Sequence, residues 1–93
     1  MDFQWDAKKA ISNLGKHGVT FQEAETVFRD PLAILFPDPD HSIGEKREII
    51  VGYSDSGQLL VVSFTERAVD SIRIISARRA DNAERRKHEQ ERD

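Results

Sequence analysis

The chain has 93 residues and a net charge of −3, enough for one hydrophobic core and too few for two, so we expect a single domain over residues 1–93. It has no cysteine, which excludes disulfides and thiolate metal sites and favours a reducing cytoplasm. We expect neither a membrane span, because no apolar run approaches the ~20 residues that a span needs, nor export, because the first residues are unlike a secretory signal. Residues 1–66 carry 6 Lys and Arg against 11 Asp and Glu, whereas residues 67–93 carry 8 against 6. The basic end permits a local phosphate-binding patch, although the acidic balance weakens long-range attraction to RNA.

Two helices are predicted in the first third of the chain. Asp6 follows a short extended segment and is placed to cap a helix that ends at Gly18, a residue suited to the left-handed C-cap position. Thr20 and Glu23 form a capping-box pattern that starts a second helix. Pro31 restricts the residue before it to extended conformations, so this helix must end near position 29.

Four runs rich in β-branched and aromatic residues follow, at 32–36, 46–53, 59–65 and 72–77. The first is bounded by prolines and is expected at a sheet edge, and the others, separated by turn sequences, predict a meander. Residues 78–93 predict a polar C-terminal helix that packs weakly, with 87–93 fraying or ordering only against a partner. The expected fold class is therefore α+β: two N-terminal helices packed on a four-stranded antiparallel sheet with a C-terminal helix.

The order and spacing of short motifs along the chain resemble those of the BrnT family of toxins. In the first half the shared residues are Trp5, Asp6, Lys9, Asn13, Lys16, His17, Gly18, Phe21, Glu23, Ala24, Val27, Phe28, Arg29, Asp30 and Pro31. In the second half they are Glu45, Arg47, Gly52, Gly57, Thr65, Glu66, Arg67, the run Ile72 to Arg78, Glu84 and Arg85. Each motif alone is weak, but together they cover nearly the whole chain from Trp5 to Arg86.

This resemblance implies a RelE-like fold and a type II toxin that cleaves RNA to inhibit translation, without metal or cofactor. It also implies a ribbon-helix-helix antitoxin similar to BrnA, expected in a heterotetramer of two toxins and two antitoxins that binds operator DNA through the antitoxin. We expect no membrane partner. The rival hypothesis is a non-enzymatic module that binds an antitoxin-like repressor and modulates its affinity for DNA.

RNA cleavage without metal requires a base for the 2′-hydroxyl proton, an acid for the leaving oxygen and cations for the phosphorane. Arginine suits the last role because its planar fork grips phosphate oxygens. We predict Arg67 and Arg78 as catalytic cations. The expected RNA-binding residues are Arg73, Arg79, Arg47 and Lys46. These side chains must converge on a groove of the open sheet face, although a meander places the strand ends before Arg67 and Arg78 at opposite edges. A solvated or ion-paired surface is the alternative for each arginine.

Four side chains are candidates for proton transfer: Glu66, His41, His17 and Lys16. Glu66 could act as the base, although orienting Arg67 is the favoured interpretation. His41 has an ordinary pKa near ~6.5, but it lies in an acidic, proline-containing loop and is typical of a surface histidine. Lys16 and His17 could face RNA, and both are also ordinary choices for a helix C-terminus.

Metal chemistry is not expected. Asp38, Asp40 and His41 bring oxygen and nitrogen donors together, but they lack the glycine and the distant glutamate of a calcium loop. A solvated loop explains the pattern. The sequence also has no glycine-rich phosphate loop and no nucleophile elbow.

Overall fold

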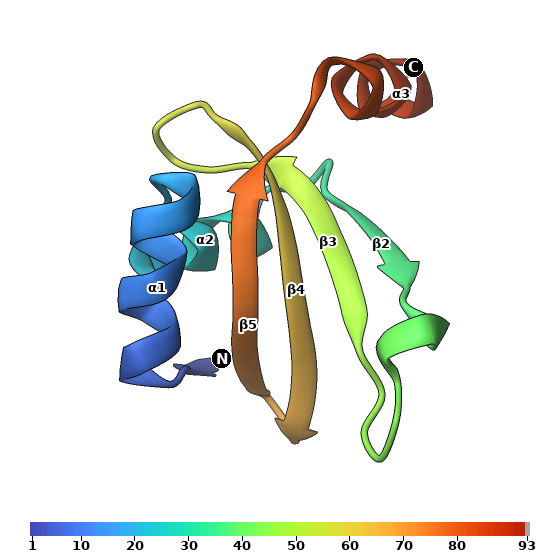
Figure 1. Cartoon of the computed structure of the whole chain (residues 1–93). Helices are drawn as coiled ribbons and strands as arrows, with labels where there is room; N and C mark the ends of the chain where they lie inside the picture. The colour runs from blue at the N-terminus through green and yellow to red at the C-terminus, as the bar shows by residue number, and fades with distance from the viewer. Residues whose placement is uncertain (93) are drawn as a thin grey trace.

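A five-stranded sheet in the order β1-β5-β4-β3-β2 forms the centre of the molecule in the computed structural model, which describes residues 1–92 (Figure 1). The elements are β1 (Asp2–Gln4), α1 (Ala7–His17), α2 (Phe21–Thr26), the 3-10 turn η1 (Val27–Arg29), β2 (Ile34–Pro37), the 3-10 turn η2 (Pro39–His41), β3 (Glu48–Tyr53), β4 (Leu59–Ala68), β5 (Ser71–Arg79) and α3 (Asn82–Arg92). The α+β class is confirmed.

The sheet differs from the predicted four-stranded antiparallel one because the N-terminal segment joins it. Strands β2 to β5 form the expected antiparallel meander, with β2 at one edge. At the other edge β1 pairs parallel to β5, with Phe3 opposite Ile72, which makes the sheet mixed. The sequence predicts an extended conformation for this segment but offers no local signal for its partner, since the two strands lie about 70 residues apart.

Side-chain caps form at the start of both N-terminal helices, as predicted. The Asp6 carboxylate accepts hydrogen bonds from the backbone N–H groups of Lys8 and Lys9, at 2.8 and 3.1 Å. Gly18 ends α1 with a φ of 68°, a left-handed conformation that costs glycine little. The Thr20 hydroxyl accepts from the backbone N–H of Glu23 at 3.0 Å and begins α2. These contacts set the predicted starts of both helices and the predicted end of α1, whereas α2 ends at Thr26 and the 3-10 turn η1 continues it to Arg29.

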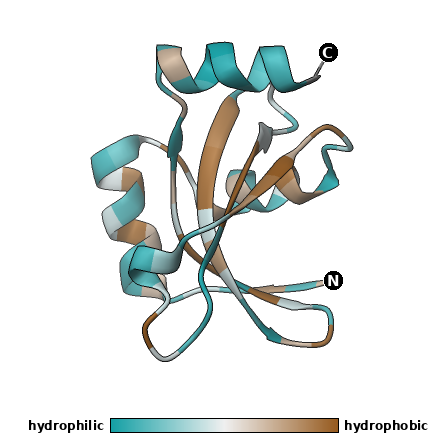
Figure 2. Cartoon of the chain, turned by 90° about the vertical axis from the view of Figure 1, so that its right-hand side faces the viewer, coloured by the Kyte–Doolittle hydropathy of each residue, from teal (hydrophilic) through white to brown (hydrophobic). Residues whose placement is uncertain are grey.

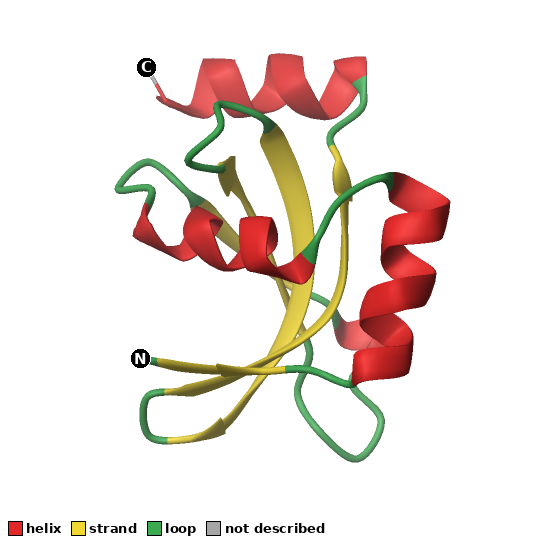
Figure 3. Ribbon diagram, turned by 90° about the vertical axis from the view of Figure 1, so that its left-hand side faces the viewer, coloured by secondary structure: helices red, strands yellow, loops and turns green. Residues whose placement is uncertain are grey.

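The main core lies between α1, α2 and one face of the sheet (Figure 3). Its buried residues are Val19, Phe21, Ala24, Val27, Ile50, Leu60, Val62, Phe64, Ile72, Ile74 and Ala77. Edge-to-face aromatic pairs join the N-terminal segment and η1 to this core. The ring centroids of Trp5 and Phe21 are 5.9 Å apart, and those of Phe28 and Phe64 are 5.0 Å apart. Each such pair adds about 0.5–1.5 kcal/mol beyond the burial of its area.

The opposite sheet face has a smaller apolar cluster around Val51, Leu59 and Val61, and α3 crosses one end of it (Figure 1). Helix α3 is drawn almost wholly in the hydrophilic colour of Figure 2. The structure carries it to Arg92, and Asp93 lies outside the described residues, so fraying of residues 87–93 stays a prediction. Among residues 1–92, the helices are too short and too polar to cross a lipid bilayer.

Asn13 makes three buried hydrogen bonds, two of which connect α1 to the free edge of β5. Its side-chain amide donates to the Ala77 carbonyl at 2.8 Å and to the Val19 carbonyl at 3.0 Å, and its oxygen accepts from the Ala77 N–H at 3.0 Å. Only 6% of Asn13 is exposed. Because β1 covers only residues 71–73 of β5, Asn13 satisfies backbone groups that lack a strand neighbour farther along.

Replacing Asn13 with alanine should destabilise the fold strongly. Asn13→Ala leaves the N–H and C=O of Ala77 buried and unpaired, so we expect a loss of about 2–4 kcal/mol in the free energy of unfolding. Urea denaturation measures this loss. Ser12→Ala, an exposed neighbour on the same helix, is the matched control and should change stability by less than about 0.5 kcal/mol. Equal stability of the two variants would show that the bridge is unimportant.

Candidate functional site

The two arginines predicted as catalytic cations lie at opposite ends of the β4–β5 hairpin. Arg78 on β5 stands opposite Val61 on β4, whereas Arg67 lies near the other end of β4, which continues to Ala68. Arg67 lies six positions after Val61 along the strand, or roughly 20 Å at ~3.3 Å per residue. The prediction that these guanidinium groups converge on one groove is therefore wrong.

Each of these arginines also carries a carboxylate partner from another segment. Arg67 lies 3.5 Å from Glu45, in the connection before β3, and not in an ion pair with Glu66. The interpretation of Glu66 as the group that orients Arg67 is wrong for this reason, and Glu66 itself is exposed near the end of β4. Arg78 forms two hydrogen bonds of 2.8 Å with Glu84 of α3. Much of the positive charge of Arg67 and Arg78 is thus neutralised.

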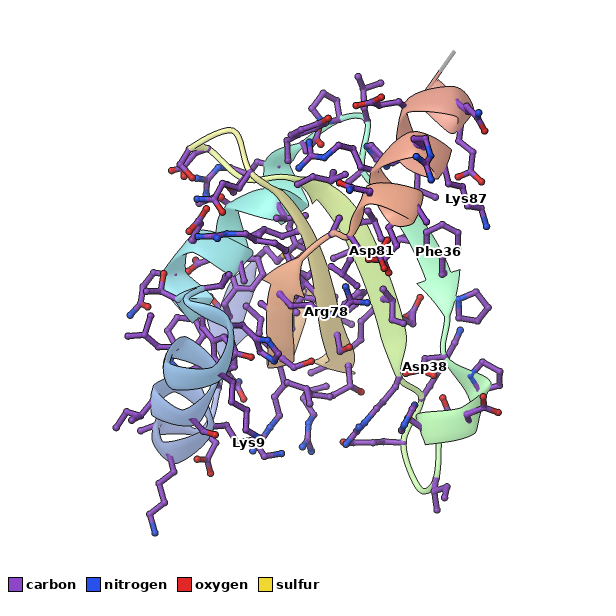
Figure 4. All side chains as sticks on the ribbon, turned by 45° about the horizontal axis from the view of Figure 1, so that its top comes forward. Lys9, Phe36, Asp38, Arg78, Asp81 and Lys87 are labelled. Atoms are coloured by element: carbon purple, nitrogen blue, oxygen red, sulfur yellow. The ribbon has the colours of Figure 1, made fainter. Side chains whose placement is uncertain are left out.

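The Arg78–Glu84 pair fastens α3 to the end of β5. Figure 4 shows Arg78 at this end of the strand and Asp81 just before the helix. Glu84 also accepts from the backbone N–H of Asp81, while the Asp81 carboxylate accepts from the backbone N–H of Glu84, a reciprocal cap that starts the helix. The hydrogen bonds from Arg78 lower the pKa of Glu84 to about 2, and Glu84 in turn raises the pKa of Arg78. This pair has a clear structural role.

The four predicted RNA-binding residues also divide between the two ends of the sheet. Arg79 lies beside Arg78 and donates to the Gln58 side chain at 2.7 Å. Lys46 and Arg47 precede β3, at the end of the sheet where Arg67 lies; the Lys46 carbonyl accepts from Thr65. Thr65 stands opposite Arg73, whose side chain points away from the main core because its neighbours Ile72 and Ile74 point into it. The six predicted cations form no single patch.

His41 lies far from His17, the other histidine predicted to transfer protons. It lies in η2 and its Nδ1 is 3.0 Å from the Asp38 carboxylate, in an exposed pair. Figure 4 shows Asp38 on the β2 side of the sheet and Lys9 on the α1 side. Within residues 1–92, His, Asp and Glu side chains nowhere gather in the groups of three that a metal site needs. Metal-independent chemistry stays a prediction.

A cleft of about 180 Å³ between α1 and β5 brings together Lys16 and His17, two of the four candidates for proton transfer. We call it the α1–β5 cleft. Its lining residues are Lys9, Ser12, Asn13, Lys16, His17, Ile75 and Ser76. Lys9, Lys16 and His17 are the basic side chains of this lining. Among the described residues, no carboxylate lines the cleft. An anion such as a phosphodiester would be attracted to this surface, although the Asp6 carboxylate at the start of α1 also acts on Lys9.

The helical repeat explains how this cleft forms. Lys9, Asn13 and Lys16 are spaced by four and three residues, so they lie on one face of α1, and the hydrogen bonds of Asn13 hold that face against β5. Residues 1–92 supply neither Lys9 nor Lys16 with a carboxylate within ion-pair distance. Lysine side chains that face a groove without partners are available to a ligand.

Arg73 is absent from the lining of the α1–β5 cleft, but it shares an electrostatic partner with Lys9. Hydrogen bonds from the backbone N–H groups of Lys9 and Lys8 lower the pKa of Asp6, and the positive charges of Arg73 and Lys9 add to this shift. Both cations therefore act on the carboxylate that caps α1. Lys9 was not among the predicted site residues, although its seven-residue spacing from Lys16 on an amphipathic helix was the signal that would have found it.

Comparison with known proteins identifies the class to which this chain belongs. Residues 5–84 match the family described as the ribonuclease toxin BrnT of type II toxin-antitoxin systems. The chain belongs to this family. Among solved structures it is similar to the crystal structure of the Brucella abortus ribonuclease toxin BrnT, with 25% sequence identity and a TM-score of 0.69 over 88% of this chain and 99% of that one. Among the curated proteins, no sequence is significantly similar.

The Arg78–Glu84 pair should make stability depend on acid pH. The pKa of Glu84 in the folded protein is about 2, below its ordinary 4.5, so its contribution is complete above pH 4.5 and is lost as the pH falls toward 2. Glu84→Gln should therefore lower the free energy of unfolding at pH 7, by on the order of 1 kcal/mol after solvent screening, and by less near pH 2. Urea denaturation at pH 7 and pH 2.5 measures the difference.

Glu89→Gln is the control for this experiment, because Glu89 is an exposed carboxylate on the same helix. Its effect on stability should be small at both pH values. A Glu84→Gln variant whose stability tracks the parent by the same margin at every pH would contradict the pairing with Arg78.

Proposed function

We propose that the chain is a metal-independent endoribonuclease that binds the RNA backbone in the α1–β5 cleft. The observation that carries this proposal is the meeting of Lys9, Lys16 and His17 in one hollow with no lining carboxylate. The family to which the chain belongs supports the reaction, since it consists of ribonuclease toxins. The net negative charge of the protein is compatible with this binding, because the positive side chains of the cleft attract phosphate at short range.

The chemistry needs only the 2′-hydroxyl of the RNA and groups that transfer protons. His17 accepts the 2′-hydroxyl proton as the 2′ oxygen bonds to phosphorus, and Lys16 donates a proton to the 5′ oxygen as its bond to phosphorus breaks. The products are a 2′,3′-cyclic phosphate and a 5′-hydroxyl. Lys9 stabilises the negative charge that grows on the phosphorane. Each bond and proton is accounted for without a cofactor.

The partner in this proposal is a ribbon-helix-helix antitoxin similar to BrnA, in a complex of two toxins and two antitoxins that binds operator DNA through the antitoxin. The type II toxin-antitoxin family supports a protein partner in the cytoplasm. Helix α1 also exposes two large apolar side chains, Ile11 and Leu14, beside an apolar hollow that contacts α2. The rival function, a module that only modulates a repressor, would use the same complex but cut no RNA.

Loss of the cleft histidine should abolish cleavage. His17→Ala should slow cutting of a defined RNA by about 10²–10⁴-fold, because it removes a group that transfers a proton in the transition state. His41→Ala is the matched control and should retain the parental rate. The assay is gel analysis of RNA cut in EDTA, with 2′-deoxy substitution at the cut site as a further test. A parent that cuts nothing in EDTA, or two histidine variants with the same rate, would refute this mechanism.

The antitoxin complex can be tested by co-expression from the native operon. We expect the toxin to co-purify with one smaller protein, and size-exclusion chromatography with light scattering to give the mass of a 2:2 assembly. The complex should bind operator DNA and should not cut RNA. The toxin alone should not bind the operator, and a toxin that did so would contradict the proposed division of roles.

A further inference from the structure

A second hollow, of about 210 Å³, lies between α3 and the sheet face opposite the main core. Its floor is apolar and consists of Phe36, Ile49, Val51 and Val61 from three neighbouring strands. Its wall is the polar helix α3, which contributes Glu84, Lys87, His88 and Glu91, and Arg78 completes the rim. We call this hollow the α3 pocket.

His88 is the side chain of α3 that does not fit a merely structural wall. Only 3% of it is exposed, and both ring nitrogens lack a hydrogen-bond partner among the described residues. The ring meets Tyr53 at 5.8 Å between centroids, which fixes its place without satisfying its nitrogens. A buried polar group without a partner costs free energy, so a buried unpartnered histidine that lines a pocket indicates a ligand with polar atoms.

From this geometry we infer that the α3 pocket holds an unpaired base of the RNA substrate, an inference that rests on the proposed ribonuclease function. A base has two apolar faces, which suit the floor of Phe36, Val51 and Val61, and an edge with donors and acceptors, which suits the two nitrogens of His88. An aliphatic side chain of a protein partner would fill the floor but leave those nitrogens unsatisfied. A base matches both features of the pocket.

The carboxylates of the rim select among bases. Both oxygens of Glu84 accept from Arg78, so Glu84 is already engaged. Among the described side chains, the partner of Glu91 is Lys87, in a long ion pair of 4.0 Å, which leaves the carboxylate able to accept a further hydrogen bond. An exocyclic amino group donates to a carboxylate, whereas a carbonyl oxygen in the same place is repelled. The pocket therefore prefers cytosine, adenine or guanine to uracil.

The α3 pocket and the α1–β5 cleft are neighbours across β5. Ser76 lines the cleft and Arg78, two residues farther along the same strand, lines the pocket, a separation of roughly 7 Å along the strand. Lys87, whose ammonium lies 5.7 Å from the Phe36 ring centroid, stands at the pocket rim where a flanking phosphate would pass (Figure 4). One strand of RNA can thus place its phosphate in the cleft and a base beneath α3.

Binding of single nucleotides tests this inference apart from cleavage. The probes are cytidine and uridine 3′-monophosphates, which share size and charge and differ in the amino or carbonyl group at C4. The full chain is titrated with each while the ring signals of its three histidines are followed by NMR. We expect the cytidine compound to shift the His88 signals and to bind about tenfold more tightly than the uridine compound.

Three variants sharpen the test. Glu91→Gln should remove most of the preference for cytidine, whereas Glu89→Gln, on the same helix but outside the pocket, should keep it. His88→Phe keeps an aromatic ring under α3 and should weaken binding of both nucleotides, with folding checked by the unchanged spectrum of the sheet. Because Glu91 is partly exposed, its variant is informative even if His88→Phe is unstable.

Several results would overturn the inference. Equal affinity for the two nucleotides would do so, as would shifts confined to His17, or His88 signals that move only when the antitoxin is added. The ribonuclease proposal fails separately: a protein that selects the cytidine compound at His88 but cuts no RNA retains the base pocket and loses the nuclease mechanism.

Discussion

The hydrogen bonds between the side chain of Asn13 and the backbone of Ala77 are the contact on which the arrangement of this molecule depends. They pair the edge of β5 with a helix in place of a strand, beyond the point where β1 stops. A strand in that position would have covered the edge with backbone. A helix covers it with side chains, and its spacing places Lys9 and Lys16 beside β5. The candidate site thus follows from the way one edge of the sheet is satisfied.

Carboxylates, more than the number of basic residues, decide which cations of this acidic chain are available to a ligand. Arg67 and Arg78 are paired with Glu45 and Glu84 and serve to join segments of the fold. The α1–β5 cleft has no lining carboxylate among residues 1–92. A protein with a net charge of −3 can therefore present a locally positive surface. Net charge governs long-range attraction, while local pairing governs what happens at contact.

Helix α3 is fastened to the sheet at its start and covers a hollow along its middle. The Arg78–Glu84 pair holds its first turn to the sheet, and His88 in its middle is buried over an apolar floor. The helix covers this face without filling it, so a hollow of about 210 Å³ stays beneath. The main core on the other face is covered by α1 and α2, and the α1–β5 cleft lies where α1 meets the edge strand β5.

The sequence alone determined the local structure and the family of this protein. Caps at Asp6 and Thr20 and the glycine at position 18 act over a few residues, and each formed where predicted. The β-branched runs formed strands whose ends differ from the predicted ones by up to three residues, as where β4 continues to Ala68. The parallel pairing of β1, the carboxylate partners of Arg67 and Arg78, and the burial of His88 were decided by tertiary structure. These contacts join residues that are distant along the chain. A local sequence pattern does not predict which of several carboxylates will pair with a given cation. Spacing predicts a helix face, but only packing determines what that face touches.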